Sequence, residues 1–295
     1  MVAVRTSVAR MEAAHIGRLP GPVGKTPGSA RIPAMDTSCV VTGGARGIGR
    51  GIAERMVERG HRVVLTDVDG AAAAATAAEI GAAEGIQQDI REPASHREVA
   101  AAAARHGVLI AWFNNAGICH DGLHADMPEE TTRRQVEVNL LGTIWGMRAA
   151  IDAFGEHGGD IVNTASLSGL GPVPDLSVYA ATKAAVVSLT MSVDAETPKS
   201  VRVHAVCPDG VQTAMLDAQT PDSLATRLVH SGGRILNVDE VAQEAVDLIG
   251  ARRVVLSIPR WRGAVVRGTA LAPSVAKRGI HLVAAQGKRR INKGS

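Results

Sequence analysis

The 295-residue sequence predicts an α/β protein built on a doubly wound parallel sheet. Three observations support this fold class. Short β-branched runs alternate with helix-length segments from Ser38 onward. The runs are apolar throughout, which is typical of strands covered on both faces of a sheet. A glycine-rich turn, Gly43–Gly49, joins the first run to the first helix.

The sheet is expected to contain clear strands separated by helices. The strands are predicted at Ser38–Thr42, Arg62–Thr66, Leu109–Phe113, Asp160–Thr164, Val201–Cys207 and Arg253–Ser257, with a weaker one near Gly85–Gln88. The clearest helices are predicted at Ile52–Glu58, Ala71–Ile80, Pro93–Arg105 and Leu176–Thr197. Aromatic residues make up only 2% of the chain, so we expect a core of Ala, Val, Ile and Leu.

Composition divides the chain into three parts. Residues 1–35 mix Arg, Gly and Pro without periodicity and are predicted to be a disordered leader. This leader is Arg-rich and poor in acids, as transit peptides are, although Met35 is an equally good start of the protein. Residues 36–270 are expected to form the single folded domain. Residues 271–295 are expected to be a basic C-terminal tail.

The net charge of +3 is distributed unevenly. Residues 251–295 hold eleven Lys and Arg and no Asp or Glu, whereas the central part of the chain is acidic. Three interpretations of the basic end remain open: a solvated tail, a contact to an acidic neighbouring subunit, or a weak peripheral contact with an anionic membrane surface.

The cysteines and the hydropathy pattern indicate the compartment. Cys39, Cys119 and Cys207 lie far apart without paired spacing, which favours a reducing compartment. No apolar run approaches the roughly 18 residues that a membrane span requires. We therefore expect a cytoplasmic protein that is at most peripheral to a membrane, with no nucleic-acid partner.

The glycine-rich turn is a candidate pyrophosphate site, because it places free backbone N–H groups at a helix N-terminus. Asp67 ends the second predicted strand, where a carboxylate can accept both ribose hydroxyls of NAD and repel the 2′-phosphate of NADP. Arg46, inside the turn, favours NADP instead. We predict NAD, with NADP as the alternative.

Tyr179 and Lys183 lie four residues apart on a predicted helix, so their side chains share one face. A free phenol has a pKa of about 10, and an ammonium held nearby lowers it. Tyr179 is therefore predicted to exchange a proton with an alcohol or a carbonyl oxygen.

In its motifs and their order, the sequence resembles the short-chain dehydrogenase/reductase family, which has a Rossmann-like sheet. The resemblance covers roughly residues 36–260 and rests on Thr42–Gly49 (T-G-x-x-x-G-x-G), Asp89-Ile90, Asn114–Gly117 (N-N-A-G), Asn139, Ser166 and Tyr179–Lys183 (Y-x-x-x-K). It implies four catalytic residues: Asn139, Ser166, Tyr179 and Lys183. It implies that the cofactor is bound by Gly43, Arg46, Gly47, Ile48, Gly49, Asp67, Asp89, Ile90, Asn115, Tyr179, Lys183, Val211 and Thr213.

The resemblance also suggests how these groups act and where this chain differs. Ser166 would hold the substrate oxygen, and Asn139 would link Lys183 to solvent through water. Asp209 stands where the family usually has glycine after Pro208, and Ala111 stands where an Asp often precedes N-N-A-G.

Two further segments lie near the expected site. Cys119, His120 and His124 lie close together in the sequence, but no second ligand pair with zinc-like spacing accompanies them, so we predict no metal. The polar segment 212–236 is predicted to form a lid over the substrate.

The sequence therefore predicts an NAD-dependent oxidoreductase that acts on a secondary alcohol or ketone. A lipophilic substrate such as a steroid or fatty alcohol is favoured, and a homodimer or homotetramer is expected. The alternatives are a catalytically silent nucleotide-binding regulatory protein and a membrane-surface scaffold of the same fold.

Overall fold

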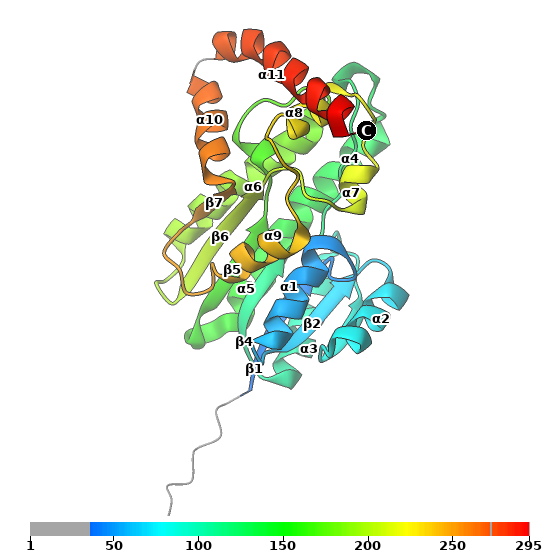
Figure 1. The fold of residues 1–295 in the computed structure, drawn as a ribbon. Helices are drawn as coiled ribbons and strands as arrows, with labels where there is room; N and C mark the ends of the chain where they lie inside the picture. The colour runs from blue at the N-terminus through cyan, green and yellow to red at the C-terminus, as the bar shows by residue number, and fades with distance from the viewer. Residues whose placement is uncertain (1–35, 272, 295) are drawn as a thin grey trace, which may run out of the picture. The chain divides into compact units, whose positions relative to one another are not determined.

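The computed structural model describes residues 36–271 and 273–294 (Figure 1). The predicted leader, residues 1–35, lies outside these described residues. None of the described helices is both long and apolar enough to cross a membrane.

The described chain contains a seven-stranded sheet with strand order β3-β2-β1-β4-β5-β6-β7. All neighbouring strands pair in parallel, which confirms the predicted fold class. The strands are β1 (Thr37–Thr42), β2 (Arg62–Asp67), β3 (Glu84–Gln87), β4 (Val108–Asn114), β5 (Gly159–Thr164), β6 (Val201–Pro208) and β7 (Val255–Ile258).

Helices cover both faces of the sheet (Figure 1). One face packs against α1 (Gly47–Glu58), α2 (Gly70–Ile80) and α9 (Val238–Val246). The other packs against α3 (Pro93–His106), α5 (Gly142–Phe154) and α6 (Ser177–Glu196). Neighbouring residues of β1 divide between the faces: Cys39 and Val41 pack with the first group and Val40 with the second, all fully buried. This two-sided burial explains why the strands are apolar throughout.

The helices between β4 and β5 are not among the predicted elements. They comprise α4 (Glu129–Val136), a π-helical turn at Glu137–Leu141 and α5. Gly142 and Gly146 weaken the helical signal of α5, because glycine is a poor helix former. Gly146 is nevertheless required by packing, since a methyl group there would clash with the Asn114 amide oxygen.

The C-terminal part of the chain is helical. Two short helices, α7 (Ala214–Asp217) and α8 (Leu224–His230), lie within the predicted lid segment. After β7 come α10 (Arg260–Leu271) and α11 (Pro273–Gly294), and α11 lies along α8 (Figure 1). The basic segment 271–295, expected as a tail, thus contains a helix that packs on the lid.

Candidate active site

A cavity of about 570 Å³ opens at the carboxyl ends of the central strands. β2 and β4 lie on opposite sides of β1, so the chain changes direction across the sheet at this edge, where ligands bind in doubly wound folds. Of the predicted site residues, the cavity is lined by Gly43, Arg46, Gly47, Ile48, Asp67, Asp89, Ile90, Asn115, Ser166, Tyr179, Lys183, Val211 and Thr213. Gly49 and Asn139 are not among the lining residues and lie behind it.

The glycine turn closes tightly against the end of β4. Gly43 has a φ of +63°, and a methyl group at Gly49 would clash with the Gly43 carbonyl oxygen. The Asn115 amide nitrogen donates to the carbonyl oxygens of Thr42 and Gly43, each at 3.2 Å. Asn115 thus braces the turn, and the N-terminus of α1 faces the cavity.

Asp67 lies at the end of β2, beside this turn. Its carboxylate oxygens accept from the backbone nitrogens of Ala45 and Asp69 at 3.4 and 3.3 Å. Both distances are long for such hydrogen bonds, so the carboxylate keeps capacity for a further donor. Arg46 and the exposed Val68 line the same part of the cavity; Val68 was not predicted, because no motif marks it.

Asp89 forms an ion pair with Arg91, a residue that no sequence motif marks. Arg91 Nη2 lies 2.6 Å from Asp89 Oδ2, and this hydrogen bond holds the pKa of Asp89 below its usual range. Arg91 also lines the cavity. Its positive charge therefore lies beside Asp89, one of the residues to which the resemblance assigns cofactor binding.

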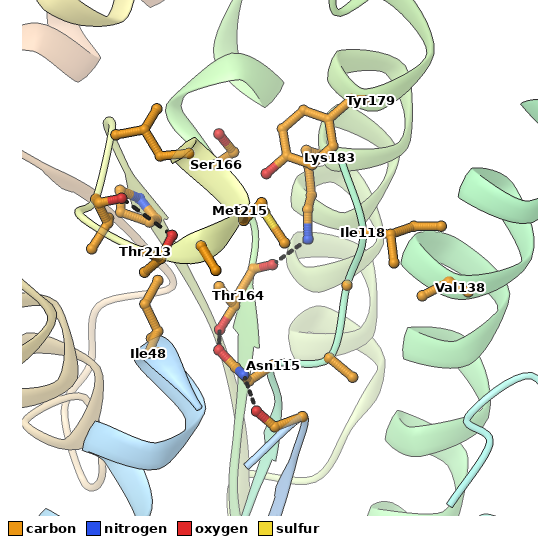
Figure 2. Close-up of a pocket in the computed structure, with 18 of the residues that line it drawn as sticks. Ile48, Asn115, Ile118, Val138, Thr164, Ser166, Tyr179, Lys183, Thr213 and Met215 are labelled. Atoms are coloured by element: carbon orange, nitrogen blue, oxygen red, sulfur yellow. Dashed lines mark hydrogen bonds between the residues drawn. The ribbon is translucent and has the colours of Figure 1, made fainter. Parts of the chain in front are cut away.

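Ser166, Tyr179 and Lys183 converge on one side of the cavity (Figure 2). Tyr179 and Lys183 project from the first half of α6, and Ser166 follows β5. The Ser166 side chain lies on the same side of the cavity as the Tyr179 hydroxyl (Figure 2), and its Oγ accepts from the backbone nitrogen of Ser168 at 3.1 Å. The Lys183 ammonium donates to the Thr164 carbonyl oxygen at 2.7 Å and lies 5.8 Å from the centre of the Tyr179 ring.

The expected lowering of the Tyr179 pKa is wrong for this structure. Tyr179 is partly accessible from the cavity, but protein atoms surround the rest of the side chain, and this burial raises the pKa of the phenol. Burial also lowers the pKa of Lys183 to about 8. The ammonium donates to a carbonyl oxygen rather than to the phenol, and burial is the largest influence on the pKa of Tyr179.

Asn139 lies in the π-helical turn and is fully buried. Its amide nitrogen donates to the Ile118 carbonyl oxygen at 2.8 Å, and its amide oxygen accepts from the Ile118 backbone nitrogen at 2.9 Å. A methyl group at Gly117 would lie 3.2 Å from the Asn139 oxygen and 3.5 Å from Lys183 Nζ. Glycine therefore leaves a small space between the two groups that the family resemblance links through water.

Asp209, which stands where the family usually has glycine, forms an ion pair with a residue of α10. Arg262 Nε lies 2.8 Å from Asp209 Oδ2, and both side chains are largely buried. Arg262 Nη2 also donates to the Leu228 carbonyl oxygen at 2.5 Å and to Ser231 Oγ at 3.2 Å. One arginine thus ties the end of β6 to the end of α8.

The lid is held on further sides. The backbone nitrogen of Thr220 donates to Asp121 at 2.9 Å, and that of Leu224 donates to Asp175 at 2.7 Å. From α11, Arg290 donates to the Ser231 carbonyl oxygen at 2.7 Å, and Lys288 pairs with Asp222 at 3.2 Å. The basic C-terminal residues Lys288 and Arg290 therefore hold segment 212–236, part of which lines the cavity.

Cys119, His120 and His124 each contact a different partner. His124 Nδ1 lies 3.2 Å from Ser177 Oγ, and Cys119 Sγ lies 3.7 Å from Gln219 Nε2. Among the described residues, no group of three or more His, Cys, Asp or Glu is arranged to hold a metal ion.

The chain is similar to known proteins in both sequence and structure. The family model for short chain dehydrogenase matches residues 37–224. An inactive 2-(S)-hydroxypropyl-CoM dehydrogenase of Xanthobacter autotrophicus is 36% identical over 68% of this chain and 92% of its own length. A 2,5-dichloro-2,5-cyclohexadiene-1,4-diol dehydrogenase of Sphingobium indicum is 37% identical over 71% and 88%. The crystal structure of a 3-ketoacyl-(acyl-carrier-protein) reductase from Brucella melitensis complexed with NADH matches with a TM-score of 0.68 at 31% identity, covering 76% of this chain and 96% of that one.

The pair of Asp209 and Arg262 gives a stability prediction. Arg262→Met leaves Asp209 buried without its cation, and removing one partner of a buried pair costs about 3–5 kcal/mol. Burial already raises the pKa of Asp209. As pH falls, the folded variant takes up a proton at Asp209 before the unfolded chain does, so the loss should be smaller at about pH 5 than at about pH 8.

Denaturant unfolding of the two single variants and the double variant tests this. Asp209→Asn combined with Arg262→Met should be more stable than Arg262→Met alone at about pH 8, because no unpaired charge remains buried. A double variant no more stable than Arg262→Met would contradict the role assigned to the pair.

Proposed function

This chain belongs to the short-chain dehydrogenase family, and from that premise we propose that it transfers a hydride between NAD(H) and a secondary alcohol or ketone. It is an NAD(P)-dependent oxidoreductase acting on CH–OH donors. The observation that carries the proposal is the convergence of Ser166, Tyr179 and Lys183 (Figure 2) in a cavity that the glycine turn and Asp67 also line.

The residues present fit a dinucleotide. The turn at Gly43–Gly49 ends at the N-terminus of α1, which favours a pyrophosphate. Asp67 has spare acceptor capacity for the ribose hydroxyls. When bound, the nicotinamide supplies the hydride chemistry. The relative crystallised with NADH supports the choice of NAD.

The protein's own contribution is the proton and the position of the substrate. In alcohol oxidation, the C–H bond breaks with its two electrons, which leave as hydride, and the O–H proton passes to Tyr179, which must first have lost its own proton and be in the phenolate form. In carbonyl reduction, Tyr179 returns the proton. Ser166 is placed to hold the reacting oxygen. Because burial raises the Tyr179 pKa, the phenol is protonated at neutral pH, the form that reduction requires.

The substrate end of the cavity favours an apolar molecule. Its walls include the side chains of Ile118, Leu176, Met215, Leu216 and Val229. A lipophilic secondary alcohol or ketone would bury its carbon skeleton against these residues. The alternative of a catalytically silent nucleotide-binding protein has an inactive relative in its favour, but the presence of Ser166, Tyr179 and Lys183 together argues against it.

Replacement of Tyr179 by phenylalanine tests the assigned acid–base group. The variant keeps the ring and loses only the hydroxyl, so we expect turnover to fall by about two to four orders of magnitude. Cofactor binding, measured by fluorescence titration with NADH, should persist. Near-normal turnover by Tyr179→Phe would contradict the mechanism.

Cofactor choice is tested at Asp67. We expect wild type to bind NADH more tightly than NADPH, and Asp67→Ala to narrow or invert the difference, because repulsion of the 2′-phosphate is lost while Arg46 remains. Asp69→Ala is the matched control: this nearby carboxylate caps α2 by accepting from Ala72 and does not line the cavity. Tighter NADPH binding by wild type would show that Arg46 decides the choice.

A peripheral membrane contact is a separate proposal for α11. Arg278, Leu282 and Arg289 are exposed, and their spacing of four and seven residues places them on one helix face. Lys288 and Arg290, by contrast, are engaged with the lid. Each basic group near an anionic surface contributes about 1 kcal/mol at most, so binding should be weak and sensitive to salt.

Vesicle sedimentation of the full chain tests this contact. Wild type should sediment with phosphatidylserine-containing vesicles at low salt and not with phosphatidylcholine alone. Leu282→Asp should abolish sedimentation, while Met191→Asp, at an exposed apolar residue of α6, should not. Equal behaviour of the two variants would remove the membrane proposal.

A further inference from the structure

The hydrogen-bonded ladder between β4 and β5 stops at the edge of the sheet that carries the cavity. Its last pair lies one residue before Thr164. The backbone nitrogens that follow β4, those of Asn115 and Ala116, donate instead to Thr42 Oγ1 at 3.0 and 3.1 Å. The Thr164 carbonyl oxygen lies beyond the ladder on this side, and it accepts from Lys183 Nζ at 2.7 Å. The last residue of β5 thus holds the ammonium of the site with its backbone.

The side chain of the same threonine is held from the direction of β4. Its hydroxyl lies 3.2 Å from Asn115 Oδ1 (Figure 2), and the Asn115 amide nitrogen lies 3.2 Å from the carbonyl oxygens of Thr42 and Gly43. Carbonyl oxygens only accept, so the amide must present its nitrogen to them and its oxygen to Thr164. The threonine hydroxyl must then donate to that oxygen. The direction of each of these hydrogen bonds is therefore determined.

One continuous path joins the glycine turn to Lys183. It runs from the turn carbonyls through the Asn115 amide to the Thr164 hydroxyl, and from the Thr164 carbonyl group to the ammonium. β6 holds the same peptide group from the other side, because Ala165 N donates to the Val206 carbonyl oxygen at 2.8 Å. The Thr164 hydroxyl is the corresponding support on the β4 side. Thr164 lines the cavity, yet the family resemblance assigns it no role.

We propose that Thr164 is a positioning residue of the reaction, which ties the turn that receives the cofactor pyrophosphate to the carbonyl group that holds Lys183. The hydroxyl acts through Asn115, so the turn and the lysine keep one fixed relative position. This inference rests on the proposed function, because it takes Lys183 as part of the reacting site. The hydroxyl of Thr164, and not its methyl group, is the part that matters.

The titration of Lys183 in the cofactor-free protein tests one end of the path. Lysine ¹³Cε NMR follows it, with the resonance assigned by Lys183→Arg, and the wild-type pKa should lie near 8. Thr164→Val keeps the shape of the side chain and removes the hydroxyl. The carbonyl oxygen then holds the ammonium less firmly, so the midpoint should move down by about half a pH unit. The titratable groups that act on Lys183, namely Tyr179, Cys119 and Cys207, stay unchanged in every variant.

Two controls separate the hydroxyl from the shape and the location of the side chain. Thr164→Ser keeps the hydroxyl and loses the methyl group, so Lys183 should titrate as in wild type. Thr197→Val removes another partly buried threonine hydroxyl, which lies outside the cavity. That hydroxyl is 3.3 Å from the carbonyl oxygens of Asp194 and Val201, and its loss should leave the Lys183 midpoint unchanged.

NADH binding tests the other end of the path. Thr164→Val leaves the Asn115 amide oxygen without its donor, so the Kd for NADH should rise by about threefold to tenfold. Thr164→Ser and Thr197→Val should bind NADH as wild type does. Asn115→Ala breaks the path at its centre, so adding Thr164→Val to it should change neither NADH binding nor the Lys183 midpoint any further. Circular dichroism checks the fold of each variant, and the comparison of Val with Ser at position 164 does not depend on Asn115→Ala.

The outcomes distinguish this inference from the proposed function, because neither measurement needs turnover. An unchanged Lys183 midpoint in Thr164→Val, unchanged NADH binding, or equal effects of Val and Ser would overturn the role of Thr164. With an alcohol that is turned over, Thr164→Val should lower kcat by about threefold to tenfold and leave the KM of the alcohol nearly unchanged. Absence of turnover with every alcohol and ketone, with the Lys183 midpoint and NADH binding still dependent on the hydroxyl, would overturn the proposed function alone.

Discussion

The burial of Lys183 and of most of the Tyr179 side chain is the constraint on which the rest of the site depends. The Lys183 ammonium is met by the Thr164 carbonyl oxygen at 2.7 Å, and no ion pair with a carboxylate accompanies it in the described structure. Its charge is therefore costly, and its pKa falls to about 8. The same low-polarity surroundings raise the pKa of Tyr179. The site thus holds a neutral phenol, ready to donate, beside a lysine that is still mostly charged at pH 7 and loses its charge at mildly alkaline pH.

The residues around Tyr179 and Lys183 come from segments that are far apart in the sequence. β1 and β4 supply the glycine turn and Asn115, β5 supplies Thr164 and Ser166, and the π-helical turn supplies Asn139. The lid is held by Asp121, Asp175, Arg262 and α11. The C-terminal helices hold the predicted lid, segment 212–236, in place. The basic end of the chain therefore helps to position one wall of the cavity, although it contains none of the reacting groups.

The sequence allowed the sheet to be predicted, and most of the predicted site residues line the cavity, because both depend on local patterns. Buried parallel strands are apolar throughout, and the glycine turn and the Y-x-x-x-K spacing are short motifs. Contacts between distant segments could not be predicted. Nothing near Asp209 in the sequence indicates that Arg262 neutralises it, and the basic residues of α11 do not reveal that Ser231 and Asp222 are their partners. The protonation of Tyr179 was predicted in the wrong direction, since spacing reveals a nearby lysine but not the depth of burial.

The protonation of Tyr179 can be measured directly, because it is the only tyrosine in the chain. The near-ultraviolet absorbance of tyrosinate, followed against pH in the cofactor-free protein, reports this one group, and circular dichroism in the same titration follows the fold. The unfolded chain should titrate near the ordinary tyrosine pKa of about 10. If burial controls the site, the folded protein should form tyrosinate only well above that pH or on unfolding. Tyrosinate appearing at or below about pH 10 in the folded protein would contradict this account. It would show that Lys183, rather than burial, sets the pKa of Tyr179.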